Sequence, residues 1–103
     1  MTDRRRLPHR RHSETFNVEC GGLHYTVTAS WFDSGELGEI WVQNGKIDSA
    51  ADAYVKDASV LASIALQRGA TLDEIRKSLL RDARENPSSP LGVALDHIAG
   101  DHP

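Results

Sequence analysis

Residues 23–31, Leu23-His24-Tyr25-Thr26-Val27-Thr28-Ala29-Ser30-Trp31, decide the fold, because apolar and polar side chains alternate along them without a break. Successive side chains of a β-strand point to opposite faces of the sheet. The pattern therefore predicts a strand with one buried face and one polar face.

Two further strands are predicted around this one. Before it, Phe16, Val18 and Cys20 alternate with polar residues, and Gly21-Gly22 suits a two-residue hairpin turn, which needs positive φ angles. After it, residues 33–36 predict a turn and residues 37–43 a third strand. Short turns between consecutive strands predict an antiparallel meander.

The first helix is predicted from a cap and a broad apolar stripe. Ser49, with Asp52 at the third helical position, is an acidic form of the capping box, and the periodic pattern runs to about Arg68. The stripe is widened by larger side chains, those of Tyr54, Leu61 and Ile64. Such a face predicts a helix laid across the sheet and covered further by its neighbours.

Two shorter helices are predicted to follow. Thr71 and Glu74 form a capping box that starts a helix ending near Arg84. Its inward side chains are expected to be those of Leu72, Ile75, Leu79 and Leu80. After a loop, Ser89 is placed as the N-cap and Pro90 as the first residue of a third helix. The inward stripe of that helix is expected to be Leu91, Ala94, Leu95 and Ile98.

Three strands followed by three helices predict an α+β fold of two layers, with the helices packed on one face of a meander sheet. We divide the chain into a disordered basic arm at residues 1–13, one domain at residues 14–99 and a tail at residues 100–103. A three-stranded sheet has two edges, and a second copy could cover one of them, so a homodimer is a reasonable hypothesis.

The basic residues are concentrated at the N-terminus. Residues 1–12 hold one aspartate and five arginines, which are Arg4, Arg5, Arg6, Arg10 and Arg11. The rest of the chain holds 7 basic and 14 acidic side chains, a poor match for the phosphate backbone of a nucleic acid. The arm therefore has two interpretations. It is a solvated or folded-back segment, or it contacts nucleic acid or another acidic partner.

The sequence offers few groups for catalysis. Its one cysteine, Cys20, excludes an intramolecular disulfide, fits a reducing cytoplasm and is interpreted as a buried thiol. A small enzyme would need Cys20 and His24 to meet across the hairpin turn, and strand alternation favours neither the same face nor opposite faces. No phosphate loop and no membrane-spanning apolar run of 18 residues is present.

The remaining histidines form two pairs near the ends of the chain, His9 with His12 and His97 with His102. A metal site needs three or four ligands on ordered backbone, so neither pair predicts one. We expect no catalytic residue, no metal, no cofactor and a cytoplasmic location.

Candidates for partner contact lie on the third strand and in the turn after it. Glu39 and Trp41 share the polar face of that strand, and Lys46 follows the Asn44-Gly45 turn. A tryptophan on a polar face either packs under the N-terminal segment, for instance Leu7-Pro8, or anchors a partner. We select Glu39, Trp41 and Lys46 as candidate contact residues.

Several segments, in the same order along the chain, resemble the TSCPD domain, a small module usually found near the C-terminal end of vitamin-B12-dependent ribonucleotide reductases. The counterparts are residues 7–16, 26–28, 38–42, 45–49, 63–69 and 90–96. The chain is similar in particular to short stand-alone bacterial members of that family, which share the opening segment and the Pro90–Asp96 end.

The motif that gives the family its name reads Ser-Cys-Pro-Asp, and this chain has Ser88-Ser89-Pro90-Leu91. The helix cap at Ser89 is kept, whereas a thiol role of the motif is in doubt. Ribonucleotide reduction, as the related enzymes perform it, needs a thiyl-forming cysteine and a second redox pair, which a single cysteine cannot supply.

The resemblance implies an accessory binding domain associated with ribonucleotide reductase and deoxyribonucleotide synthesis, not catalytic alone. The implied partner is a reductase chain, with a second copy of the chain as a further one. The alternative is a protein that binds nucleic acid or an acidic partner through the arginines of the arm.

Overall fold

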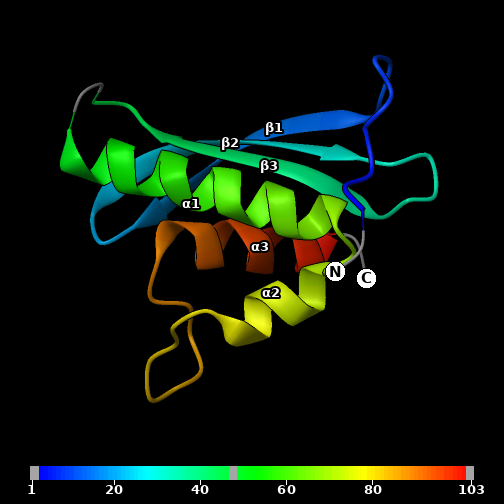
Figure 1. Ribbon diagram of the computed structural model, residues 1–103. Helices are drawn as coiled ribbons and strands as arrows, with labels where there is room; N and C mark the ends of the chain where they lie inside the picture. Colours follow the sequence, from blue (N-terminus) through cyan, green and yellow to red (C-terminus); the bar gives the residue numbers. More distant parts are fainter. Residues whose placement is uncertain (1–2, 47–48, 102–103) are drawn as a thin grey trace.

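The computed structural model describes residues 3–46 and 49–101 and shows a three-stranded sheet with helices against it (Figure 1). The strands are β1 (Ser13–Cys20), β2 (Leu23–Trp31) and β3 (Leu37–Asn44), antiparallel and in the order β1-β2-β3. Val27 of β2 lies opposite Phe16 of β1 and Val42 of β3. Gly21 and Gly22 have φ angles of 60° and 79°, as the predicted hairpin turn requires.

Three helices follow the sheet, namely α1 (Ala50–Gln67), α2 (Leu72–Ser78) and α3 (Pro90–Asp101). The predicted α+β class, the meander and the helices packed on its face are therefore confirmed. Helix α1 contacts the sheet through β3, whereas α3 contacts both β1 and β3, and α2 packs on α3 (Figure 1). Among the described residues, no helix is both long enough and apolar enough to span a membrane.

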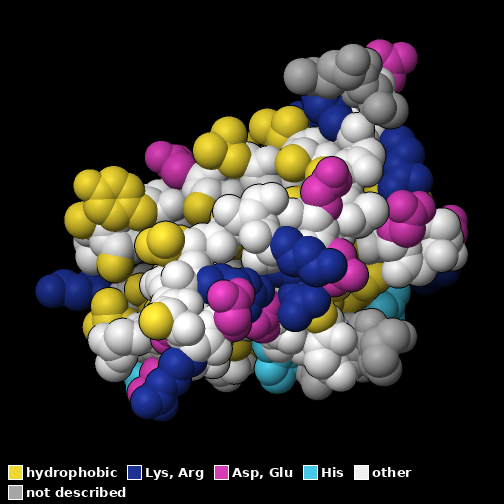
Figure 2. Space-filling model, turned by 90° about the horizontal axis from the view of Figure 1, so that it is seen from below, with side chains coloured by type: hydrophobic (Ala, Val, Ile, Leu, Met, Phe, Trp, Pro, Cys, Tyr) yellow, Lys and Arg dark blue, Asp and Glu magenta, His cyan; other side chains and the backbone are white. Residues whose placement is uncertain are grey.

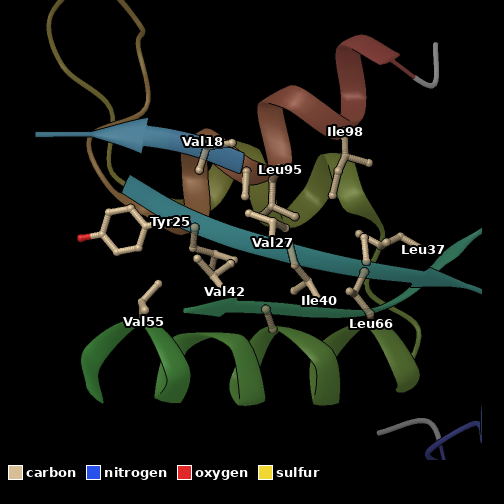
Figure 3. Close-up of a cluster of buried hydrophobic side chains, with 14 of the residues drawn as sticks. Val18, Tyr25, Val27, Leu37, Ile40, Val42, Val55, Leu66, Leu95 and Ile98 are labelled. Atoms are coloured by element: carbon tan, nitrogen blue, oxygen red, sulfur yellow. The ribbon is translucent and has the colours of Figure 1, made fainter. Parts of the chain in front are cut away.

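The hydrophobic core lies between the sheet and the two longer helices (Figure 3). Leu95 and Ile98 point from α3 toward the sheet, and Val55 and Leu66 point from α1 toward β3. The inward stripe predicted for α3 is confirmed, because its four members are all buried. They are Leu91, Ala94, Leu95 and Ile98.

The second helix is shorter than predicted, ending at Ser78 rather than near Arg84. The reason is a turn centred on Asp82, whose carboxylate accepts the N–H groups of Arg84 at 2.8 Å and Asn86 at 2.9 Å. These local bonds replace the i to i−4 bonds that a longer helix would have made. As a result Leu80, predicted to point inward, is 74% exposed.

Two side chains predicted to widen the inward stripe of α1 point to solvent instead. Tyr54 is 74% exposed and Leu61 is 68% exposed, and the inward side of this helix carries polar residues among its apolar ones. The prediction failed because α1 packs along β3 rather than across all three strands.

Candidate functional site

A row of buried polar side chains joins α1 to β3. The row consists of Asp52, Ser59, Ser63 and Gln67. The Ser59 hydroxyl accepts the N–H of Val42 at 2.9 Å and donates to the Val55 carbonyl at 2.7 Å. The Ser63 hydroxyl accepts the N–H of Ile40 and donates to the carbonyl of the same residue, both at 3.0 Å.

The side chains at the two ends of the row also hydrogen bond to the backbone of β3. The Gln67 side-chain amide donates to the Gly38 carbonyl at 2.9 Å, and the Asp52 carboxylate accepts the N–H of Asn44 at 3.0 Å. Every second residue of β3, from 38 to 44, turns its backbone polar groups away from β2. Helix α1 bonds to at least one of these groups at each of the four positions, so this edge of the sheet is closed to another strand.

Asp52 takes part in this contact instead of completing the predicted capping box. The Ser49 hydroxyl accepts the N–H of Asp52 at 3.1 Å, as predicted, but the carboxylate turns to Asn44 and to the Lys56 ammonium, 2.7 Å away. The hydrogen bond from Lys56, with help from the N–H of Asn44, holds the pKa of the Asp52 carboxyl below its ordinary value, although burial opposes the shift.

The N-terminal arm, defined here as residues 3–12, lies against the end of this α1–β3 contact. The backbone N–H of Arg5 donates to the Gln67 carbonyl at 2.6 Å, and Nε of Arg4 donates to the Gln67 side-chain oxygen at 2.6 Å. The guanidinium of Arg5 stacks 3.9 Å above the ring of Phe32. The arm thus continues the row of contacts that begins at Asp52.

Two ion pairs and one apolar contact hold the arm along β3. Arg5 pairs with Glu36 at 3.3 Å, and Arg11 pairs with Glu39 at 3.2 Å. A methyl of Leu7 lies so near Gly38 that a Cβ there would be 2.8 Å from it. In the structure the arm is folded back, and two of its arginines meet carboxylates of the acidic body.

Trp41 lies on the open face of the sheet. Its side chain is 38% exposed, and its indole N–H donates to the Gln43 side-chain oxygen at 3.2 Å. A hollow of about 400 Å³ beside it is lined by eight residues, among them Arg4, Glu39, Trp41 and Gln67. A methyl of Leu7 lies beside Gly38, and Leu7 does not line the hollow beside Trp41.

A second hollow, of about 580 Å³, follows the arm. It is lined by Arg4, Arg5, Arg6, Leu7, His9, Arg11, Glu39 and Gln67. The two hollows share Arg4, Glu39 and Gln67, so the arm and β3 form one surface, which we term the arm–β3 surface.

The arm–β3 surface unites two groups of residues that the sequence suggested separately. It brings Glu39 and Trp41 together with the arginines at positions 4, 5, 6 and 11. Arg10 lines neither hollow, and neither does Lys46, whose backbone N–H donates to the Asn44 side-chain oxygen at 2.8 Å. The hydrophobic periodicity of the sequence does not predict that the arm arginines contact Glu39 and Trp41, because this contact depends on how the arm folds back on the domain.

Ser89 and Pro90 lie at the start of α3, away from this surface. Helix α3 begins at Pro90, and the Ser89 hydroxyl accepts the N–H of Gly92 at 3.2 Å. The arrangement is that of a helix N-cap with proline at the first helical position.

Sequence reasoning missed a charged cluster between α2 and α3. The Asp96 carboxylate accepts two bonds from Arg81, at 2.7 and 3.0 Å, and one from Arg76 at 3.0 Å. The hydrogen bonds from Arg81 lower the pKa of the Asp96 carboxyl below its ordinary value. Burial opposes this shift, and the hydrogen bond from Arg76 adds to it. Figure 2 shows the molecule from below, with basic and acidic side chains adjoining at the middle of the view and hydrophobic ones toward its upper left.

The groups considered for catalysis do not assemble. Cys20 packs at the margin of the core, whereas His24 lies opposite Glu19 with 3.8 Å between its Nδ1 and the Glu19 carboxylate, so Cys20 and His24 occupy opposite faces of the sheet. His97 stacks on Phe16 with 4.4 Å between ring centroids, and His102 lies outside the described residues. Across the described ranges, no three His, Cys, Asp or Glu side chains gather as metal ligands.

Comparison with known proteins relates the chain to one class of enzyme. The vitamin B12-dependent ribonucleotide reductase of Bradyrhizobium diazoefficiens is 31% identical over 74 residues, which are 72% of this chain and 6% of that enzyme. The enzyme of the same name from Agrobacterium fabrum is 31% identical over 72 residues, which are 70% of this chain and 6% of the enzyme. No family model and no solved structure matches. The chain is therefore related to vitamin B12-dependent ribonucleotide reductases and spans about 6% of the length of those relatives.

Proposed function

We propose that this chain is an accessory binding domain that associates with a ribonucleotide reductase and is not catalytic alone. The observation that carries the proposal is the relationship itself, because 72% of the chain matches a segment that makes up 6% of a much longer enzyme. A segment of that size corresponds to one small module. The likeness to the TSCPD domain is the finer form of the same proposal.

The chemistry of the chain supports binding rather than catalysis. One cysteine is present in 103 residues, and it lies on the opposite face of the sheet from His24. The polar side chains buried between α1 and β3 are used in holding the fold, as their hydrogen bonds to backbone groups show. Trp41 remains on the surface beside the arm, 38% exposed.

We assign the partner contact to the arm–β3 surface. Tryptophan and arginine are the residues most enriched among those that dominate binding energy at protein interfaces. Trp41 is 38% exposed there, beside Arg4 and the Arg11–Glu39 pair. Lys46 stays a candidate at the margin, on the turn after β3.

Affinity capture from the native cells tests this proposal. Tagged wild-type protein is expected to recover a ribonucleotide reductase chain in near-equal amount, and Trp41→Ala to recover at least tenfold less, which is about 1.4 kcal/mol of binding. The matched control is Leu61→Ala, which removes another exposed apolar side chain, on α1, and is expected to recover the wild-type amount. Recovery of the bait alone, with reductase present in the lysate, would overturn the proposal.

A second candidate function is the binding of a nucleic acid or another acidic partner through the arm. The observation that favours it is the hollow of about 580 Å³ whose lining includes four arginines and His9. Arg5 and Arg11 are already paired with Glu36 and Glu39, so less positive charge is available to an acidic partner. Binding by this route would weaken steeply between low and physiological salt and disappear on deletion of residues 1–12.

A further inference from the structure

We propose that the outer edge of β1 pairs antiparallel with β1 of a second copy of this chain, joining two sheets into one. The inference is independent of the proposed function and starts from the two edges of the sheet. The β3 edge is closed, because Asp52, Ser59, Ser63 and Gln67 hydrogen bond to its backbone. The β1 edge is therefore the edge at which another strand could pair with the sheet.

The direction of the free backbone groups on β1 follows from one hydrogen bond. The N–H of Trp31 donates to the carbonyl of His12 at 3.0 Å, so residue 12 faces β2 with its backbone groups. Because backbone groups alternate along a strand, even-numbered residues bond to β2 and odd-numbered ones turn outward. The outward groups are those of Thr15, Asn17 and Glu19. Among the described residues, no hydrogen bond engages their backbone on that side.

This edge lacks several of the devices that usually prevent strand pairing, and its charged side chains are those of Glu14 and Glu19. Proteins protect an edge with proline, with charged side chains, especially lysine, with a bulge or with a covering helix or loop. Residues 13–20 contain neither proline nor lysine, and they pair with β2 in unbroken register. The one irregularity of the sheet lies at Ser30/Trp31, between β2 and β3.

The charges of β1 suit a second copy in a restricted set of registers. In a two-fold antiparallel pair, outward-turned residues must oppose outward-turned residues, so odd positions face odd positions. Glu14 and Glu19 therefore never face each other. An axis at Phe16 places Glu19 opposite Ser13, and an axis at Asn17 places it opposite Thr15. Identical strands can thus meet without a like-charge pair.

The inner face of β1 supplies an apolar reason for the same contact. Phe16 is half-buried, packed against the core and stacked on His97. In the two registers its neighbour across the junction is a second Phe16 or Val18. Aromatic pairs and aromatic–β-branched pairs each stabilise a sheet beyond the effect of alanine at the same positions. Pairing of two copies would therefore extend the apolar layer of one sheet into the next.

Light scattering across a concentration series tests the inference on the full chain. We expect a mass of twice 11.3 kDa for the wild type and for the control Asn17→Thr. Asn17→Pro removes an outward N–H, together with the exposed hydrogen bond that the Asn17 side chain accepts from Thr26, and is expected to give 11.3 kDa with an unchanged circular dichroism spectrum. A monomeric wild type at every concentration, or a dimeric Asn17→Pro, overturns the inference.

A second pair of variants keeps the test decisive if proline at this position unfolds the chain. Asn17→Lys keeps the backbone N–H but places a like charge on each side of the junction, and it is expected to be monomeric. Leu61→Asp alters the exposed apolar side of α1 instead and is expected to stay dimeric. A dimeric Asn17→Lys, or dissociation by Leu61→Asp, would contradict pairing through β1.

Discussion

The Ser63 hydroxyl of α1 lies 3.0 Å from both the amide nitrogen and the carbonyl oxygen of Ile40, so one side chain satisfies both backbone groups of a residue on β3. The contact is buried, where water cannot replace either bond. Three further side chains of α1 each hydrogen bond to one backbone group of the strand, those of Asp52, Ser59 and Gln67. The contact explains why a helix predicted to be mainly apolar on its inner side carries buried polar residues there.

Replacing Ser63 with alanine is expected to lower the free energy of unfolding by roughly 1–3 kcal/mol, since it leaves two buried backbone groups without partners. The measurement is urea unfolding followed by circular dichroism. The control is Ser78→Ala, whose hydroxyl donates to the Glu74 carbonyl on an exposed turn. The control is expected to change stability by less than about 0.5 kcal/mol. Equal losses from the two variants would mean that the α1–β3 bonds contribute nothing specific.

Gly38→Ala is expected to destabilise the protein by about 1–3 kcal/mol and to loosen the arm. A Cβ at this position would lie 2.7 Å from Phe32 and 2.8 Å from Leu7, so the arm must move or the strand must shift. Gly45→Ala is the matched control, because a Cβ there meets nothing within 4 Å. Thermal unfolding gives the stability of both variants, and limited proteolysis at the arm arginines reports the loosening. Retained stability and an intact arm in Gly38→Ala would show that Leu7 does not pack there.

Stability is expected to fall as the solution becomes acid. The folded-state pKa values of Asp52 and Asp96 lie below the ordinary 3.8, so the charged carboxylates stabilise the fold at neutral pH. That stabilisation is complete above the unfolded-state pKa and is lost as pH falls through the folded-state values. The free energy of unfolding should therefore be level above about pH 5 and decline below it.

The contribution of Asp96 to this decline is measurable with one variant. Asp96→Asn removes the charge between Arg76 and Arg81, so it should be less stable than the wild type at pH 7 and lose less on acidification. Asp57→Asn alters an exposed carboxylate of α1 and should follow the wild-type curve. Equal losses of stability in Asp96→Asn and the wild type between pH 7 and pH 3 would show that the Asp96 carboxylate does not contribute to the decline.

Trp41→Ala is expected to change the free energy of unfolding by less than about 1 kcal/mol while weakening partner binding. The reason is its position on the open face, where 38% of the side chain is exposed. Thermal unfolding of the variant, compared with Leu61→Ala, separates the two effects. A large loss of stability would mean that the indole serves the fold and not a partner.

The strands and α3 could be predicted from the sequence because each carries a simple period. Alternation from Leu23 to Trp31 and the stripe from Leu91 to Ile98 depend only on local geometry, and the structure has both. The capping box of Thr71 and Glu74 is also local and is present. The early end of α2 was missed because the turn bonds of Asp82 compete with a helix in a way that periodicity does not reveal.

The parts that could not be predicted depend on tertiary contact. Tyr54 and Leu61 fit a helical stripe, but the edge position of α1 turns them to solvent. The position of Asp52 suits a capping box, but its carboxylate instead accepts a hydrogen bond from the backbone N–H of Asn44. Arg11 meets Glu39 only after the arm has folded back, so the candidate site could be named residue by residue but not assembled.

Direct titration of this chain with a purified vitamin B12-dependent ribonucleotide reductase from the same cells tests the central claim. We expect saturable binding at one chain per reductase subunit, with an affinity at least tenfold weaker for Trp41→Ala and unchanged for Leu61→Ala. Absence of heat or mass change on titration with folded wild-type protein would contradict the claim that this chain is a reductase accessory domain.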